Sequence, residues 1–501
     1  MNPELRILTL LCCVVLTAAS AFANAPVTID LDRILPGAQG EDVLANYDPD
    51  FPARGGDVDW GLALSGGGLR SAAFSIGAMK ALYDLGLLDD IDVISSVSGG
   101  GYASYWLYSR YLPEDTQNFG HAAFRNDLFS RNVCTLGAKS NFFPFSRMIA
   151  AVFSPRDRAF RKYRDSIEWS FGPDHWRSRK HIRETGESNM RRLRHLVPAI
   201  TAGRAPYFII NATIETDKGR QGQKLTDIEK TFEIGPTYRG STALGFSEWK
   251  SDDTGINAWC NATAMSGAGI RFKFSRKIAD YDEPDDKDRI DLADGGLSEN
   301  LAALPLIRRG VKNIIIVDAE NDPGYKFVSY CNLRKHLRER NIALAVRAID
   351  SFFDCDTKRH TSGVKRFTAT AVAQGTATYA GGVSKIFYIK MSRPASIFPQ
   401  SPGGRDAIGD EKHRRDIRPS GCRDGQVEHV TSETLRREMH AYSRYLNEDW
   451  PWGKFFEFLP WINYNFPQIT TIDQTFYNDQ LKAFIGLGYL ETIEMGPIRG
   501  K

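Results

Sequence analysis

The chain has 501 residues, of which 42% are hydrophobic and 25% are charged. These values are typical of globular proteins and exclude a disordered or fibrous chain. Its 64 basic and 61 acidic side chains leave a net charge of only +3, so no overall charge favours nucleic acid. The length allows a large core, and we expect one elaborated domain with insertions.

The first 23 residues follow the pattern of a secretory signal. Arg6 precedes an apolar stretch at residues 7–16, and small residues end at Ala23. The apolar run is shorter than the roughly 20 residues of a membrane-spanning helix. We therefore expect an exported chain, periplasmic or secreted, cleaved after Ala23, with an uncleaved anchor as the alternative. Residues 24–57 are rich in Pro, Asp and Gly and predict an extended lead-in.

Removal of the signal would leave cysteines without a CxxC pair, at Cys134, Cys260, Cys331, Cys355 and Cys422. This spacing does not indicate a zinc site. An exported chain meets oxidising conditions, in which one or two disulfides are compatible with this number of cysteines. The sequence does not indicate which of them pair.

From residue 58 onward, apolar runs of strand length alternate with helical patterns. A strand at 62–64, a helix at 71–85 and a strand at 91–97 predict a βαβ unit. Such units imply an α/β fold, in which a parallel sheet carries helices on both faces. Further strands are expected at residues 207–213, 289–293, 313–317 and 386–391.

Basic and aromatic residues between about 140 and 204 predict an inserted helical region. Charge runs of this kind are usually solvated helix faces. The alternative is a peripheral membrane contact through residues 142–204, helped by the apolar stretches at 142–145 and 148–153. No recognised motif favours nucleic acid.

The carboxyl-terminal part divides into two expected segments. Residues 401–425 read as an exposed polar loop, and residues 426–501 as a segment that packs on a main domain at 58–400. The sequence gives no indication of the oligomeric state.

Two glycine-rich turns follow the first two strands. In Ser65-Gly66-Gly67-Gly68-Leu69-Arg70, successive amides at a helix start would attract an anion, either a phosphate or an oxyanion. Neither a Walker loop nor GxGxxG matches this spacing. In Ser96-Val97-Ser98-Gly99-Gly100-Gly101, a serine on a strand-to-helix turn would expose its hydroxyl, as in GxSxG elbows. Ser96 replaces the first glycine but is also small; a turn that serves packing alone is the alternative.

A third motif, Asp294-Gly295-Gly296, follows the strand expected at 289–293 and precedes a helix expected at 298–309. An aspartate at the carboxyl end of a strand faces the usual ligand crevice of an α/β sheet. In isolation an Asp-Gly turn would be the simpler interpretation. Asp291 is the neighbouring alternative, but no glycines follow it.

These motifs, in this order, resemble the patatin-like phospholipase family, whose signature is a GGGxR oxyanion loop, a GxSxG serine and a DGG or DGA aspartate. The resemblance covers about residues 58–107 and 290–318, and less specifically residues 261–270. It implies a three-layer α/β/α fold with a mainly parallel central sheet and helical insertions. It also implies a Ser-Asp dyad that acts without a histidine.

Residue by residue, the resemblance assigns Ser98 as nucleophile, Asp294 as base, and Gly66, Gly67 and Gly68 as oxyanion donors. Supporting positions would be Arg70, Gly100, Gly295 and Gly296. The implied substrate is a phospholipid or another acyl-ester lipid, and the chemistry requires no metal or organic cofactor.

Two other functions are compatible with the residues. An ordinary α/β-hydrolase would use a Ser-His-Asp triad, with a histidine drawn from His336, His360, His413, His429 or His440. A catalytically silent lipid-binding or membrane-binding protein could keep the same fold.

Overall fold

The structure is a computed structural model that describes the chain in segments. These are residues 58–111, 155–172, 192–201, 203, 205–215, 224–241, 245–248, 259–267, 276–279, 289–361, 372–379, 382–392, 467–468, 471, 476 and 478–496. The expected signal at 1–23, the lead-in at 24–57, the polar loop at 401–425 and most of the segment at 426–501 lie outside the described residues.

One mixed sheet organises the described residues. Its strands are β1 (Trp60–Leu64), β2 (Val93–Val97), β3 (Tyr207–Ile214), β4 (Thr231–Ile234), β5 (Tyr238–Ser241), β6 (Gly245–Glu248), β7 (Arg276–Ala279), β8 (Arg289–Asp294), β9 (Asn313–Asp318), β10 (Ala343–Val346), β13 (Val372–Tyr379) and β14 (Gly382–Lys390). The order is β10-β13-β14-β9-β1-β2-β3-β4-β5-β6, and β8 pairs with β3 and β7. A small separate sheet joins β11 (Phe353–Asp354) to β12 (Arg359–His360).

The centre of the sheet is parallel and its outer pairs are antiparallel. Strands β14, β9, β1, β2 and β3 pair with one another in parallel. The pairs that involve β4 to β8, β10 and β13 with their neighbours are antiparallel. The predicted parallel centre is confirmed, and each expected strand is present. The antiparallel margins were not predicted, because alternation of strands with helices indicates only the parallel part.

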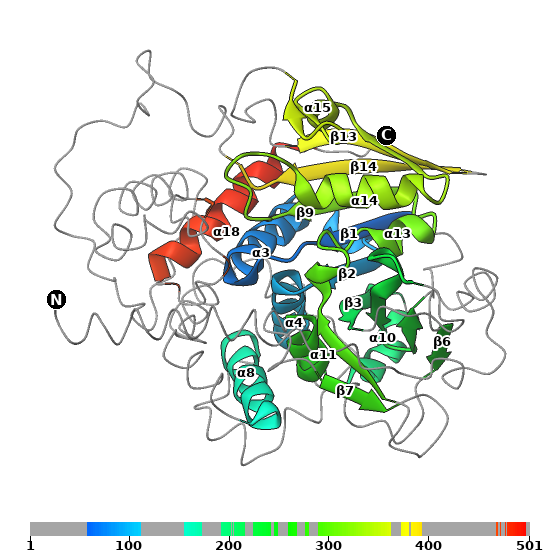
Figure 1. Ribbon diagram of the computed structural model, residues 1–501. Helices are drawn as coiled ribbons and strands as arrows, with labels where there is room; N and C mark the ends of the chain where they lie inside the picture. The colour runs from blue at the N-terminus through cyan, green and yellow to red at the C-terminus, as the bar shows by residue number, and fades with distance from the viewer. Residues whose placement is uncertain are drawn as a thin grey trace, which may run out of the picture.

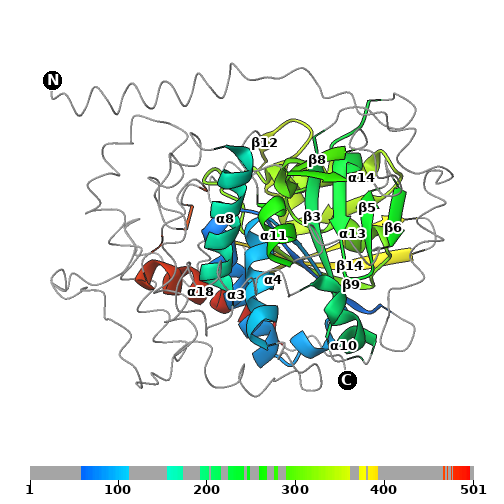
Figure 2. The same cartoon turned by 90° about the horizontal axis from the view of Figure 1, so that it is seen from below.

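Helices cover both faces of this sheet, which confirms the α/β/α layering. They are α3 (Gly68–Asp84), α4 (Gly99–Tyr111), α8 (Arg156–Phe171), α10 (Val197–Thr201), α11 (Trp259–Ser266), α13 (Leu304–Arg308), α14 (Val328–Arg338), α15 (Arg347–Asp350) and α18 (Asn478–Ile493), with 3₁₀ turns at 88–90, 193–196, 228–230 and 295–297. Seen from below, α3, α4 and α18 lie on one side of the sheet and α13 and α14 on the other (Figures 1 and 2). Within the segments that the structure describes, no helix is both long and apolar enough to cross a membrane.

The prediction of a helix at residues 298–309 is wrong. Only the short helix α13 forms within this range, and it is separated from the 3₁₀ turn at 295–297 by a segment in which Ala302 has φ 57°. The carboxylate of Glu299 accepts the amides of Leu301, Ala303 and Leu304 at 2.6, 2.8 and 3.2 Å. A side chain that takes these donors competes with a continuous helix, so the chain bends here instead.

Helix α8 lies within the region expected to be inserted. Phe160, Tyr163, Ile167 and Phe171 are buried on one of its faces, whereas basic residues such as Arg158 are exposed. The helix is therefore amphipathic and is held by its apolar face. The apolar stretches expected to touch a membrane, at 142–145 and 148–153, lie outside the described residues.

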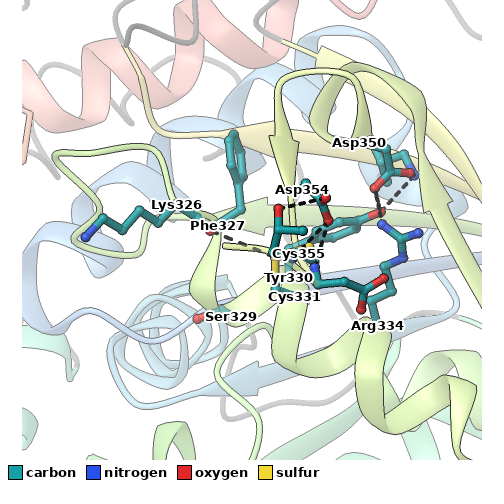
Figure 3. Close-up of a disulfide and its surroundings, with 12 residues drawn as sticks. Lys326, Phe327, Ser329, Tyr330, Cys331, Arg334, Asp350, Asp354 and Cys355 are labelled. Atoms are coloured by element: carbon teal, nitrogen blue, oxygen red, sulfur yellow. Dashed lines mark hydrogen bonds and ion pairs between the residues drawn. A yellow bond between two sulfur atoms is a disulfide. The ribbon is translucent and has the colours of Figure 1, made fainter. Parts of the chain in front are cut away.

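A disulfide joins Cys331 of α14 to Cys355, just after β11, across 24 residues of sequence. Beside it, the hydroxyl of Tyr330 and the guanidinium of Arg334 donate to Asp350 at 3.0 and 2.6 Å (Figure 3). The disulfide and these bonds tie α14 to the segment that carries α15 and β11. Cys260 is buried and forms no disulfide.

Helix α18 packs against α3 through two glycines (Figure 1). A Cβ atom on Gly77 would lie 1.9 Å from the carbonyl oxygen of Ile485, and one on Gly488 would lie 2.0 Å from that of Phe74. The two backbones are therefore in direct contact, and a side chain at either position would separate them.

We expect Gly488→Ala to lower the free energy of unfolding by about 1–3 kcal/mol, because the added methyl overpacks this contact. The direction is informative, since Ala in a helix is otherwise favoured over Gly by about 1 kcal/mol. Denaturant unfolding would measure the change. Gly324→Ala is the control, since the nearest atom to its Cβ is at 3.5 Å. Equal or higher stability of Gly488→Ala would contradict the packing described.

Candidate active site

Ser98 occupies a sharp turn between β2 and α4. Its φ of 49° is unusual for a residue other than glycine and is typical of a strained, functional turn. A Cβ on Gly99 would lie 2.2 Å from the carbonyl oxygen of Gly68, and one on Gly100 would lie 2.2 Å from that of Leu64. Only glycines allow the turn to approach the first glycine-rich loop so closely.

The hydroxyl of Ser98 faces the carboxylate of Asp294. Its Oγ donates to Asp294 Oδ2 across 3.4 Å, and both residues are brought together across β2, β3 and β8. Asp294 Oδ1 accepts the amide of Gly296 at 2.9 Å, which fixes the carboxylate. A Cβ on Gly295 would lie 2.2 Å from the carbonyl oxygen of Asn211, so this turn also needs glycine.

The strand that carries Asp294 has a different direction from the one that the sequence suggested. Strand β8 runs antiparallel to β3, with Asp294 opposite Ala212. The aspartate thus ends a strand that enters from beyond the carboxyl edge of the parallel sheet. Asp291 lies earlier on the same strand and does not line the cleft that contains Ser98.

The first glycine-rich loop lies against the serine. Gly67 and Gly68 have φ of 140° and 63°, a conformation that favours glycine. The amide of Gly66 donates to the carbonyl of Asn300 at 2.9 Å. Among the described residues, no acceptor engages the amides of Gly67 and Gly68. These two amides, rather than that of Gly66, are the candidate donors to an oxyanion.

Arg70 lies beneath the same loop. It is buried, its Nε donates to the carbonyl of Ala319 at 3.1 Å, and its Nη2 donates to Thr471 Oγ1 at 3.2 Å. A Cβ on Gly67 would lie 2.9 Å from that Nη2, so the guanidinium is in contact with the loop backbone. Burial lowers the pKa of Arg70 to about 10 against the opposing charge of Glu320, so it remains protonated at neutral pH.

A cleft of about 470 Å³ joins these elements. Its walls include Gly66, Gly67, Arg70, Ser98, Asp294 and residues of α14. Two large apolar side chains at its edge, Leu297 and Val328, are 42% and 49% exposed. The cleft therefore combines a polar floor with an apolar rim.

Ser266, at the end of α11, is a site residue that sequence reasoning did not single out. Its Oγ accepts the amide of Ser98 at 2.8 Å and donates to the carbonyl of Asn211 at 2.6 Å. One hydroxyl thus ties the turn that carries Ser98 to β3. The only signal in the sequence was the less specific resemblance of residues 261–270 to the family, which singled out no particular side chain.

The described histidines do not complete a triad with Ser98. His336 lines the cleft, but its Nδ1 and Nε2 lie 3.4 Å from Glu339 and 3.9 Å from Asp227. His360 packs between the rings of Phe352 and Phe353. The other candidates, His413, His429 and His440, lie outside the described residues.

A buried ionic cluster lies behind the cleft wall. Lys390 Nζ lies 2.9 Å from Asp318, 3.8 Å from Glu320 and 3.6 Å from Asp322. Burial raises the pKa of Glu320 from 4.5 to about 7, although the charge of Lys390 opposes this shift. Glu320 also lines the cleft, so its protonation changes the charge next to Arg70.

We expect Ser266→Ala to leave the buried amide of Ser98 without its acceptor, at a cost of about 1–3 kcal/mol in stability. Loss of this hydrogen bond should also slow labelling of Ser98 by a fluorophosphonate. Denaturant unfolding and labelling kinetics would measure both effects. Ser104→Ala, whose hydroxyl bonds only to the carbonyl of Gly100 within α4, is the matched control. Parent-like labelling of Ser266→Ala would contradict the positioning role.

Glu320 predicts a pH-dependent stability. Since its pKa is higher in the folded chain, unfolding releases a proton, and stability falls as pH rises between about 4.5 and 7. In the parent, the free energy of unfolding should fall by on the order of 2–3 kcal/mol across this window because of Glu320, and in Glu320→Gln this part of the fall should be absent. Denaturant unfolding at pH 5 and pH 8 tests this, with exposed Glu339→Gln as control. An unchanged pH dependence in Glu320→Gln would rule the assignment out.

Comparison with known proteins identifies a family and a fold. The patatin-like phospholipase family model matches residues 62–307. None of the curated proteins matches the sequence. Among solved structures, human GIVD cytosolic phospholipase A2 has a TM-score of 0.50 at 13% identity and is matched over 90% of this chain and 61% of its own.

The same human protein in complex with methyl gamma-linolenyl fluorophosphonate and terbium chloride has a TM-score of 0.45 at 13% identity, over 87% of this chain and 57% of its own. VipD from Legionella pneumophila has a TM-score of 0.24 at 14% identity, over 57% and 56%. The chain spans about three fifths of the length of the human phospholipase, and the likeness concerns the fold. With its motifs, sheet and family match together, the domain at residues 62–307 belongs to the patatin-like phospholipase family.

Proposed function

We propose that this protein hydrolyses fatty acyl esters of lipids, as a phospholipase A or lysophospholipase, through a Ser98 acyl-enzyme. The single observation that carries the proposal is the pair of Ser98 Oγ and Asp294 Oδ2, 3.4 Å apart on a strained turn in a cleft. The family match supports a lipid hydrolase. The acyl-enzyme step and the two residue roles are our proposal.

In the proposed reaction, the ester carbonyl enters with its oxygen at the amides of Gly67 and Gly68. Asp294 accepts the proton of Ser98 as Oγ attacks, and the tetrahedral oxyanion is stabilised by these amides. The amino-terminal end of α4 favours the negative charge that develops at the serine. As the tetrahedral intermediate collapses, the ester C–O bond breaks and the alcohol portion of the lipid leaves with the proton from Asp294. Asp294 then accepts a proton from water, whose oxygen attacks the acyl-enzyme, and the fatty acid leaves as Ser98 recovers its proton. The distance of 3.4 Å is expected to shorten when substrate is bound.

An acyl lipid fits the composition of the cleft. The exposed side chains of Leu297 and Val328 offer an apolar edge for an acyl chain, and the polar floor holds the reacting ester.

We also propose peripheral contact with anionic lipid through residues 142–204, supported by the exposed basic face of α8. Sedimentation with anionic and neutral vesicles tests this contact; equal binding to both would contradict it.

We further propose that the chain is exported. The signal pattern at residues 1–23 supports export, and so does the disulfide Cys331–Cys355, which is stable in oxidising compartments. The mass of the exported chain would show whether cleavage follows Ala23. Retention of the chain in a reducing compartment would contradict the proposal.

The dyad is tested by hydrolysis of phospholipids and of simple acyl esters by the purified protein, Ser98→Ala and Asp294→Asn. We expect each variant to lose activity by about 10³-fold or more, because nucleophile and base act as a unit. A fluorophosphonate should label the parent but not Ser98→Ala. His336→Ala is the control that separates the dyad from a triad, and it should keep its turnover.

Other outcomes favour the alternatives. Collapse of activity in His336→Ala would support a Ser-His-Asp triad. A parent that binds lipid vesicles but neither hydrolyses esters nor reacts with the fluorophosphonate would support the catalytically silent binding protein.

A further inference from the structure

Asn300 brings an amide side chain into the cleft beside the candidate dyad. It lies in the bend after the 3₁₀ turn at 295–297 and lines the cleft together with Ser98 and Asp294. A Cβ on Gly66 would lie 2.2 Å from Asn300 Oδ1, and one on Gly296 would lie 2.7 Å from the same oxygen. The oxygen is therefore between the first glycine-rich loop and the turn that follows Asp294.

The same contacts place this oxygen near both residues of the dyad. The Cβ on Gly66 would also lie 3.3 Å from Ser98 Cβ, and the Cβ on Gly296 would lie 3.3 Å from Asp294 Oδ1. Asn300 Oδ1 and Asp294 Oδ1 are thus separated by no more than two long hydrogen bonds laid end to end. One water molecule can bridge two acceptors at such a separation.

Two hydrogen bonds fix Asn300 in this place. Its carbonyl accepts the amide of Gly66 at 2.9 Å, and its Nδ2 donates to Ser329 Oγ on α14 at 3.1 Å. The second bond assigns the amide nitrogen to α14 and leaves Oδ1 beside Gly66 and Gly296. Among the described residues no donor engages Oδ1, and the protein does not enclose this atom. Asn300 thus offers the cleft an acceptor that is already held in position.

The neighbouring side-chain oxygens of the segment 295–300 are already engaged by the protein. The carboxylate of Glu299 accepts three backbone amides. The hydroxyl of Ser298 donates to the carbonyl of Gly295 at 3.1 Å. Within this segment, Asn300 Oδ1 is therefore the oxygen that can accept a hydrogen bond from a molecule in the cleft.

We propose that Asn300 is a catalytic residue of deacylation, in which its Oδ1 accepts a hydrogen bond from the water that attacks the acyl-enzyme. This inference rests on the proposed Ser98 acyl-enzyme. The attacking water has two protons, and each needs an acceptor. Asp294 takes the proton that is removed, and Asn300 Oδ1 holds the proton that stays. With both protons directed away, a lone pair of the water oxygen faces the acyl carbon.

The step is balanced without any further reactant. The water oxygen forms a bond to the acyl carbon as Asp294 removes the first proton. The tetrahedral intermediate then collapses as the bond between the acyl carbon and Ser98 Oγ breaks, and Asp294 returns its proton to Oγ. The second proton leaves with the carboxyl group of the fatty acid, and Asn300 is unchanged.

Methanol separates this role from a structural one, because methanol has only one hydroxyl proton. Asp294 removes that proton during methanolysis, and no second proton is left for Asn300. The protein and its variants would receive a nitrophenyl acyl ester in water with added methanol, and the ratio of methyl ester to free fatty acid would be measured. For Asn300→Ala we expect this ratio to rise about tenfold, since only hydrolysis loses a hydrogen bond.

Two further variants isolate the acceptor. Asn300→Asp keeps an oxygen at this place, and Ser329 can keep the contact because a hydroxyl donates as well as accepts. This variant should keep the parental product ratio even where its overall rate is lower. Asn300→Leu removes the acceptor but keeps the size of the side chain, and it should raise the ratio as Asn300→Ala does. Thermal unfolding identifies any variant that fails to fold, and Asn300→Leu decides the matter should Asn300→Ala be the one.

Asn313→Ala is the matched control. Asn313 lies at the start of β9, and its Nδ2 donates to the carbonyl of Asp59 at 3.1 Å and not to the site. Its product ratio should equal that of the parent.

The possible failures are distinguishable. A parent that forms no methyl ester, and no acylated Ser98 in the mass of the acid-quenched protein, would overturn the proposed acyl-enzyme itself. If the parent forms both products, but Asn300→Ala and Asn300→Leu keep its ratio, the acyl-enzyme stands and the role of Asn300 is wrong. An equal rise in Asn300→Asp would also overturn this role, since loss of the acceptor would then not be the cause.

Discussion

The contact between two glycine turns is the constraint on which the site depends. The turn after β2 approaches the turn after β1 so closely that a Cβ on Gly99 would overlap the carbonyl of Gly68. This contact places Ser98 in the same cleft as Gly66 and Gly67. Because β1 and β2 are adjacent and parallel, the sheet itself sets the spacing of the two turns. The position of Ser98 beside the first glycine-rich loop is thus set by backbone geometry.

Local pattern was sufficient to predict the parallel centre of the sheet and the three motifs. Apolar runs such as β1 and β9 are buried on both faces, so they stand out in the sequence. Glycines at 66–68 and 99–100 could be interpreted because tight turns need them. The juxtaposition of Ser98 and Asp294 followed from resemblance to a family, and spacing in the sequence alone would not have given it.

What could not be predicted depends on contacts between distant segments. Strand β8 runs antiparallel, and no local property of its residues indicates direction. Ser266 is a serine among small residues, and it binds the amide of Ser98 only because α11 ends beside the turn that carries Ser98. The engagement of the Gly66 amide by Asn300 likewise requires a fold that brings residues far apart in sequence together. The prediction of a helix at 298–309 was wrong because the carboxylate of Glu299 accepts backbone amides of this segment, and helix propensity takes no account of such a bond.

The boundaries of the family match have a practical meaning. The match ends at residue 307, whereas β9 begins at Asn313 and pairs along the whole of β1. A fragment cut at residue 307 would expose β1, a buried apolar strand, as an open sheet edge of the kind that promotes aggregation. It would also lack Ala319, whose carbonyl accepts a hydrogen bond from Arg70 beneath the first glycine-rich loop. The smallest unit that could be expressed in soluble form is therefore larger than the region that sequence comparison recognises.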